Sequence, residues 1–211
     1  MKQIDTLITR YPQLEVCRDD IVKAYYLLLE TYRQERKLLV AGNGGSASDS
    51  EHIVGELMKE FRLKRKVYAE QADAMMAIDP GMGKALAENL QGALPAICLT
   101  GHSALTTAFM NDANADFVFA QQVNGYGKRD DVFLGISTSG NSKNVCYAAI
   151  TAKAKGLKVI GLTGAKESKL SSLADVCIRV PETVTYKIQE LHLPVYHCLC
   201  LMLEDYFFWE R

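Results

Sequence analysis

The chain has 211 residues, 48% of them hydrophobic, and a formal net charge of −1 at pH 7. This length and composition suffice for one sizeable core and favour a single domain over residues 1–211. The balance of 24 Lys and Arg against 25 Asp and Glu creates no general basic field, so nucleic-acid binding is not expected.

The chain also lacks the marks of a secreted or membrane protein. Its six cysteines form no Cys-x-x-Cys pair and lie mostly in apolar segments, which favours buried free thiols in a reducing compartment. The first residues are mixed and polar, and predict no secretory signal. The most apolar stretch, 191–208, carries His192, His197, Glu204 and Asp205, which argues against a membrane span. We therefore expect a cytoplasmic protein.

The first third of the chain reads as mainly helical. The apolar spacing along residues 1–35 predicts an N-terminal helical segment that Pro12 divides. A short apolar strand over 37–41 ends in glycines, and a helix is expected over 47–61. Residues 62–93 form a predicted helical hairpin, inserted in the domain, with a turn signal between its two helices.

Beyond the insertion, apolar strands alternate with helices. Four further strands are predicted at 94–100, 131–137, 157–164 and 174–181, and the last helix at about 185–208. Apolar strands that alternate with helices indicate a parallel sheet covered on both faces. The predicted class is α/β, an open doubly wound sheet of five parallel strands, flavodoxin-like and flanked by helices. Ligands of such sheets bind beyond the carboxyl ends of the strands.

Two polar loops follow predicted strands at that edge. Residues 42–46 read Gly-Asn-Gly-Gly-Ser, which lets the backbone approach a ligand and opens a helix whose N-terminus attracts anions. An ordinary strand–helix turn explains this loop equally well. Residues 137–142 read Ser-Thr-Ser-Gly-Asn-Ser. One helix cap needs one hydroxyl, and this loop carries four, so phosphate binding is favoured there.

Four segments together resemble the sugar isomerase (SIS) domain family, and within it the phosphoheptose isomerase group. They are GNGGSASDSEH (42–52), GISTSGNSKNV (135–145), GLTG (161–164) and IQELHLPVYH (188–197). The resemblance covers nearly the whole chain outside 62–93. It implies an SIS fold and an enzyme that interconverts sedoheptulose 7-phosphate and D-glycero-D-manno-heptose 7-phosphate.

The resemblance also implies a role for individual residues. The phosphate group would be held by Ser137, Thr138, Ser139 and Ser142. The rest of the sugar would contact Asn43, Gly44, Gly45, Asn111, Asp112 and Gln189. The zinc-ligand set of the family, one ion per subunit, is matched by His52, Glu56, Gln189 and His197. The family is tetrameric, so a homotetramer with active sites at subunit interfaces is expected.

The chemistry of aldose–ketose isomerisation explains why the site needs a carboxylate and an imidazole. An aldose–ketose interconversion moves a proton between C1 and C2 through an enediol, and needs one base at carbon and one group that carries the hydroxyl proton. We assign Glu56 as the base and His197 as its partner. Zinc could polarise the carbonyl, but metal binding by Glu56 competes with its use as a base, and the sequence leaves both roles open.

Helix geometry constrains this site. His52 and Glu56 are four residues apart and share one helix face. Gln189 and His197 are eight apart, about 12 Å along an ideal helix. Either Pro194 distorts the helix, or the two side chains serve sites in different subunits. His192 is expected to be a satisfied core histidine, and the basic run at 62–66 a solvated face.

Departures from the family leave an alternative open. Glu60, Tyr186 and Lys187 stand where the family often has Arg, Asp and Arg, so a different sugar phosphate remains a live substrate. A non-catalytic SIS protein is the alternative from another class, such as a sugar-phosphate sensor or a tetrameric scaffold that associates with a replication initiator. Such a module has no need of Glu56, Gln189 and His197 together with His52, so the enzyme is favoured.

Overall fold

The fold is built on one parallel sheet with the strand order β2-β1-β3-β4-β5. A computed structural model describes residues 2–209. The strands are β1 (Leu38–Ala41), β2 (Ala96–Cys98), β3 (Val132–Ile136), β4 (Lys158–Thr163) and β5 (Val176–Arg179). Every neighbouring pair is parallel. The predicted five-stranded, flavodoxin-like sheet is confirmed, although the strands are shorter than the apolar runs that predicted them.

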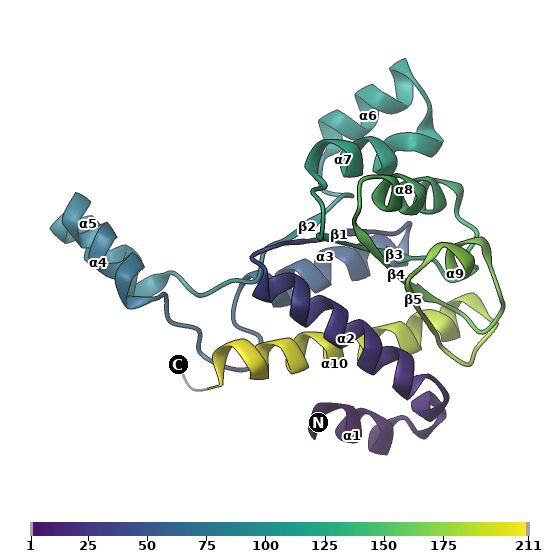
Figure 1. Ribbon diagram of the computed structural model, residues 1–211, viewed down its shortest axis with the longest axis horizontal. Coiled ribbons are helices and arrows are strands. Elements are labelled where there is room, and N and C mark those ends of the chain that lie inside the picture. Colours follow the sequence, from purple (N-terminus) through teal and green to yellow (C-terminus); the bar gives the residue numbers. More distant parts are fainter. Residues whose placement is uncertain (1, 210–211) are drawn as a thin grey trace.

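Helices cover both faces of the sheet (Figure 1). Successive side chains of a strand point to opposite faces, so Leu38 and Val40 enter one core, and Leu39 and Ala41 enter the other. The first core is closed by α1 (Lys2–Arg10), α2 (Arg18–Arg33), α3 (Gly45–Met58) and α10 (Thr185–Phe208). The second is closed by α6 (Ser103–Asp112), α7 (Val118–Tyr126), α8 (Lys143–Ala154) and α9 (Lys169–Leu173).

Most elements lie where they were expected. Pro12 opens the 3-10 helix η1 (Pro12–Cys17), which separates α1 from α2. The short elements η2 (Ala115–Phe117), α7 and α9 had not been predicted. Pro194 lies inside α10 without ending it. Among the described helices, none has both the length and the apolar character needed to span a bilayer.

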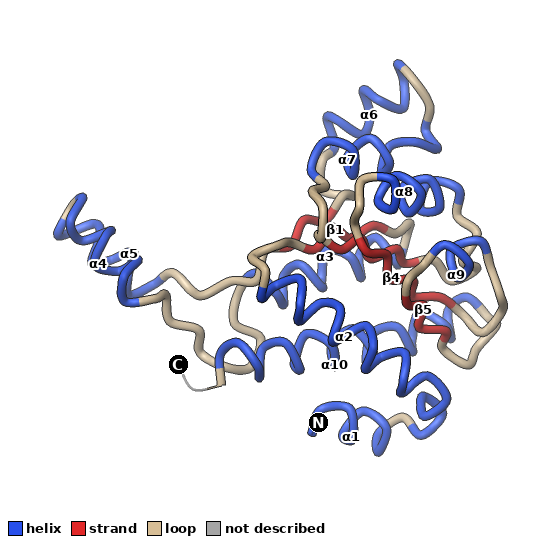
Figure 2. The backbone as a smooth tube through the Cα atoms, viewed as in Figure 1, coloured by secondary structure: helices blue, strands red, loops and turns tan. Residues whose placement is uncertain are grey.

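The insertion forms an arm that projects from the body of the molecule (Figures 1 and 2). It consists of α4 (Ala69–Ile78) and α5 (Pro80–Asn89). Asp79 joins them and accepts a hydrogen bond from the Met82 amide at 2.7 Å, which caps α5. The predicted helical hairpin is therefore confirmed. Its outer surface keeps large apolar side chains exposed, with Ile78 at 87% and Met82 at 72%.

The base of the arm is fixed to the body by a buried arginine. Arg65 is 1% exposed and forms an ion pair with Glu204 of α10 at 2.9 Å. Its guanidinium also donates to the carbonyls of Leu57 at 2.8 Å and Glu56 at 2.9 Å. These carbonyls lie in the last turn of α3, where intrahelical partners run out. Arg65 thus joins the end of α3 to α10.

The basic run that contains Arg65 is therefore not a solvated face throughout, and that expectation was wrong. Lys64 and Lys66 are exposed, as expected, but Arg65 between them is buried. Charge patterning could not separate it from its neighbours, because its partner Glu204 lies far along the chain. The guanidinium also lies over the Phe208 ring, 4.6 Å from its centroid.

Replacing Arg65 with Met should lower the free energy of unfolding by about 3–5 kcal/mol, because Glu204 would remain buried without its counter-ion. Urea unfolding followed by circular dichroism measures the loss. Lys64→Met makes the same chemical change at an exposed neighbour, and its effect should stay within about 0.5 kcal/mol. Equal losses in the two variants would contradict this role of Arg65.

His192 of α10 lies in the core but is not satisfied there. It has 0% exposure, and within residues 2–209 neither ring nitrogen has a hydrogen-bond partner. Burial lowers the pKa of its imidazole to about 4, and the backbone of Thr163 offsets only part of that effect. The ring is therefore neutral at neutral pH.

The depressed pKa of His192 predicts a pH-dependent stability. The unfolded chain takes up this proton near pH 6.5 and the folded chain only at about pH 4, so stability should fall as the pH drops through that window. From pH 7.5 to pH 5.5 the loss should be about 1–2 kcal/mol. His192→Leu should flatten this slope in urea unfolding. An unchanged slope would mean that His192 titrates normally.

Candidate functional site

The centre of the candidate site lies where α3 packs against α10. The helix α3 starts directly after the glycine loop, at Gly45, which follows Gly44 with a φ of 57°. His52 and Glu56 are on the face of α3 that meets α10, and His197 approaches them from α10. His52 Nε2 lies 3.1 Å from Glu56 Oε1 and 3.5 Å from His197 Nε2. The structure thus brings His197 to His52 and Glu56, although His52 and His197 are 145 positions apart in the sequence.

Glu56 is placed to act as a base. Its side chain is only 13% exposed. One oxygen meets His52, while the other, Oε2, is buried without a hydrogen-bond partner among the described residues. The Lys59 ammonium stays 3.9 Å from that oxygen. A buried carboxylate oxygen without a donor retains a lone pair for a proton or a cation.

The surroundings of His197 favour its neutral form. Burial lowers the pKa of its imidazole first, and nearby His52 lowers it further, while Glu56 acts in the opposite direction. The Phe61 ring also covers it, with centroids 5.3 Å apart. A neutral imidazole has one nitrogen that accepts and one that donates, so it can carry a proton between two atoms of a substrate.

Tyr196 and Asp49 lie behind His52, and the sequence analysis did not identify them. The Tyr196 hydroxyl is 3.0 Å from His52 Nδ1 and 3.1 Å from Asp49 Oδ1. Burial raises the pKa of Tyr196 well above its usual value, and also raises that of Asp49. The signal available in the sequence was spacing, because Asp49 precedes His52 by three residues and so shares its helix face.

The serine-rich loop forms a second part of the site, at the carboxyl end of β3. Ser137 and Ser142 place their hydroxyl oxygens 2.9 Å apart. Ser142 precedes α8 but makes no side-chain cap, so its hydroxyl is not used by the helix. Gly140 turns the loop with a φ of +66°, and an added Cβ would collide with Ser168. Ser137 is buried, Thr138 half-buried and Ser139 exposed.

A cavity of about 210 Å³, here called the loop cavity, opens beside this loop. It lies between the loop, the ends of β4 and β5 and the start of α10. Thr138, Ser139 and Asn141 line it from the loop. Lys166 and Thr185 also line it, and the sequence analysis missed both because neither lies in a serine-rich segment. A lysine beside hydroxyls and a helix N-terminus can bind an anion, but Glu167 and Glu182 also line this cavity and oppose one.

Gln189 lies at the glycine loop and away from the three-residue centre. A Cβ added to Gly45 would come within 2.5 Å of Gln189 Nε2, so the glycine leaves room for this amide. Its neighbour Ile188 lines the loop cavity. Since α10 continues through Pro194, Gln189 and His197 remain about two turns apart. Pro194 does not interrupt the helix, and the explanation that the two side chains serve different subunits stays a prediction.

The remaining sugar-contact candidates occupy different positions. Asn43 is exposed beside the serine-rich loop and exchanges two amide hydrogen bonds of 2.9 Å with Asn144 of α8. Asn111 and Asp112 are exposed in the last turn of α6, where Asn111 donates to Asp112 at 2.9 Å. Within residues 2–209 neither hydrogen-bonds to the two loops.

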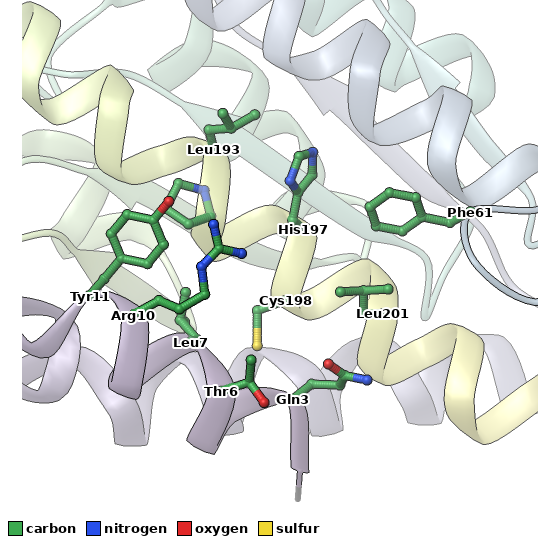
Figure 3. A pocket seen from close by; sticks show the side chains of 11 residues that line it. Gln3, Thr6, Leu7, Arg10, Tyr11, Phe61, Leu193, His197, Cys198 and Leu201 are labelled. Atoms are coloured by element: carbon green, nitrogen blue, oxygen red, sulfur yellow. The ribbon is translucent and has the colours of Figure 1, made fainter.

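His197 also opens on a larger cavity on the other side, between α1 and α10 (Figure 3). This cavity, here called the α1–α10 cavity, has a volume of about 440 Å³. Arg10, Tyr11 and Phe61 contribute to its walls. It shares no lining residue with the loop cavity. In one chain, His197 and the serine-rich loop therefore face different spaces.

The side chains at the centre are suitable zinc donors but do not form a complete site. As they stand, residues 2–209 contain no group of three or more His, Cys, Asp or Glu side chains that could hold a metal ion. Zinc prefers imidazole nitrogen and carboxylate oxygen, which are the atoms that converge here. Glu56 Oε2 adds a buried oxygen that lacks a partner. The donor chemistry fits, and a further ligand is needed to complete it.

Comparison with known proteins identifies the family of this chain. Residues 71–164 match a family model described as the SIS domain. A phosphoheptose isomerase of Helicobacter pylori strain P12 is 37% identical over 194 residues, 92% of this chain and 88% of the relative. That of Aneurinibacillus thermoaerophilus is 37% identical over 180 residues, 85% of this chain and 78% of the relative.

Solved structures lead to the same family. The phosphoheptose isomerase from Neisseria gonorrhoeae aligns with a TM-score of 0.75 at 30% identity, covering 95% of this chain and 94% of that one. The enzyme from Francisella tularensis aligns with a TM-score of 0.73 at 29% identity, with the same coverage. The chain therefore belongs to the phosphoheptose isomerase family of SIS-domain proteins.

Proposed function

We propose that this protein is a sedoheptulose 7-phosphate isomerase that forms D-glycero-D-manno-heptose 7-phosphate through an enediolate. The contact of His52, Glu56 and His197 across α3 and α10 is the observation that carries the proposal. A binding module needs hydroxyls and a helix N-terminus for the phosphate, but it does not need a carboxylate and two imidazoles beside them. The sensor and scaffold alternatives leave this cluster unexplained.

Glu56 performs the transfer at carbon in this proposal. It removes the proton from C1 of the ketose, and the electron pair forms the C1–C2 double bond of the enediolate. It then returns the proton to C2, which leaves the aldehyde at C1. Glu56 Oε2 is buried without a hydrogen-bond donor among the described residues, and this supports the role. Restricted exposure keeps bulk water from exchanging the proton between the two steps.

His197 carries the other proton. As C1 loses its proton, the oxygen on C2 gains one and the oxygen on C1 must give one up. A neutral imidazole can accept one proton and donate the other within the same site. The lowered pKa of His197 supports this role, since the neutral form predominates at neutral pH.

The phosphate end of the substrate would be held by Ser137, Thr138, Ser139 and Ser142. The uncapped hydroxyl of Ser142 and the amino end of α8 support this assignment. Lys166 adds a positive charge at the rim of the loop cavity. Asn43, Gly44, Gly45 and Gln189 lie on the side of the loop that leads towards α3, and would contact the sugar hydroxyls. Asn111 and Asp112 stay candidates for the same task.

We further infer that zinc binds through His52, Glu56 and His197. Gln189, the remaining family ligand, lies away from these three in one chain and would complete the site only from a second subunit. When bound, the metal polarises the substrate carbonyl. The chain's own residues still orient the sugar and move its protons. The convergence of imidazole and carboxylate donors, with Glu56 Oε1 beside His52 Nε2, supports the assignment.

The active site is proposed to form between subunits of a cytoplasmic homotetramer. Two observations support this arrangement. His197 and the serine-rich loop of one chain open on separate cavities. Gln189 and His197 are separated along a continuous helix, so they suit sites of different subunits. A second copy could bring its own loop to His197. The arm, with its exposed apolar side chains, is a further candidate contact between subunits.

The first test is turnover of sedoheptulose 7-phosphate by the purified protein, with added zinc and after chelation. Formation of the heptose aldose, measured by enzymatic coupling or NMR, is expected, and chelation should suppress it. Turnover that survives complete removal of metal would contradict the zinc assignment alone. Binding of sugar phosphate with no turnover under any condition would instead support the sensor alternative.

The second prediction concerns Glu56. Glu56→Gln should lower kcat by about 10²- to 10⁴-fold, because an amide cannot take a proton from carbon. The melting temperature should change little, since the side chain keeps its shape. Glu51→Gln makes the same change at an exposed position on α3 and should retain activity. A fully active Glu56→Gln enzyme would exclude Glu56 as the base.

A further inference from the structure

One face of α3 carries three ionisable side chains that the proposed chemistry does not all use. Asp49, His52 and Glu56 lie three and four residues apart, so they form one stripe towards α10. Tyr196 of α10 lies between the first two. It is 1% exposed, and its hydroxyl contacts both Asp49 and His52. The result is a continuous chain of hydrogen-bonding groups from Asp49 to Glu56.

The direction of these hydrogen bonds follows from the donors available. The Asp49 carboxylate only accepts, so the single hydroxyl proton of Tyr196 is donated to it at 3.1 Å. The Tyr196 oxygen can then only accept a further hydrogen bond. It can hydrogen-bond to His52 Nδ1 at 3.0 Å only if that nitrogen carries a proton. In the neutral ring, His52 is therefore held as the Nδ1–H tautomer.

This tautomer leaves His52 Nε2 without a proton. Its lone pair faces Glu56 Oε1 at 3.1 Å and His197 Nε2 at 3.5 Å. Two lone-pair atoms at such a distance repel each other unless a cation lies between them. The hydrogen bonds of Asp49 and Tyr196 thus leave the space between His52 Nε2, Glu56 and His197 suited to a positive charge.

We propose that Tyr196 and Asp49 are positioning residues that hold His52 in its Nδ1–H tautomer and aim its Nε2 lone pair at a divalent cation shared with Glu56 and His197. The inference rests on the proposed function, since it assigns a metal to that site. It goes further by naming what orients the ligand. Hydrogen bonding of the distant ring nitrogen commonly fixes the orientation of a metal-binding histidine.

The tautomer can be measured without metal or substrate. Long-range ¹H–¹⁵N NMR spectra distinguish the two ring nitrogens, and the chain has only four histidines, so His52→Gln identifies the His52 signals. At pH 8 in metal-free protein, we expect Nδ1 of His52 to carry the proton. In Tyr196→Phe the Nε2–H form should gain population, because Glu56 Oε1 then offers the nearest acceptor.

A matched control exists in Tyr32→Phe. The Tyr32 hydroxyl is also buried but has no hydrogen-bond partner among the described residues, so its loss should leave the His52 spectrum unchanged. A His52 that is Nε2–H in the wild type would overturn the proposal. So would an Nδ1–H form that persists unchanged in Tyr196→Phe. Neither result depends on isomerase activity, so failure here is distinct from failure of the proposed function.

Zinc affinity supplies the second readout. Competition with a zinc-binding dye should show the zinc Kd raised about 10- to 100-fold in Tyr196→Phe and in Asp49→Asn, with Tyr32→Phe unaffected. Asp49→Asn is informative because its amide can donate to Tyr196, which would turn the Tyr196 proton towards His52. Unchanged zinc affinity in both site variants would overturn the positioning role.

Discussion

The buried ion pair of Arg65 and Glu204 is the constraint on which the site depends. A charge placed at zero exposure must keep its partner, so Arg65 and Glu204 cannot separate without a large loss of stability. Arg65 also holds the last carbonyls of α3, one of which belongs to Glu56. The same side chain thus fixes the arm, the end of α3 and the position of α10. Only with these helices in register do His52 and Glu56 meet His197.

The helix α10 divides the site into two parts. Its first turns lie at the loop cavity and the glycine loop, where Ile188 and Gln189 take part. About two turns later His197 meets α3 and opens on the α1–α10 cavity. A rigid helix therefore separates phosphate binding from proton transfer within one chain. Such a division is useful when the two parts are completed by different subunits of a symmetric assembly.

Two buried polar atoms without hydrogen-bond partners among the described residues lie at the α3–α10 contact. Glu56 Oε2 and Asp49 Oδ2 are buried there without hydrogen bonds from residues 2–209, and His192 lies in the core on the same helix α10. Natural proteins satisfy nearly all buried polar atoms, so exceptions call for a functional reason. Two of these belong to the stripe that the proposed chemistry uses. His192 does not, and its neutral ring contributes mainly packing.

The sequence by itself determined the order of strands and helices, because apolar period and turn residues are local signals. It also determined the chemistry of the candidate residues, since hydroxyls, amides, imidazoles and carboxylates keep their preferences in any fold. Only the tertiary structure decided which of them meet. Arg65 reads as one more surface cation until Glu204 is brought to it, and Tyr196 reads as a core aromatic until Asp49 and His52 reach its hydroxyl. Such contacts join residues more than a hundred positions apart, and helix packing decides them.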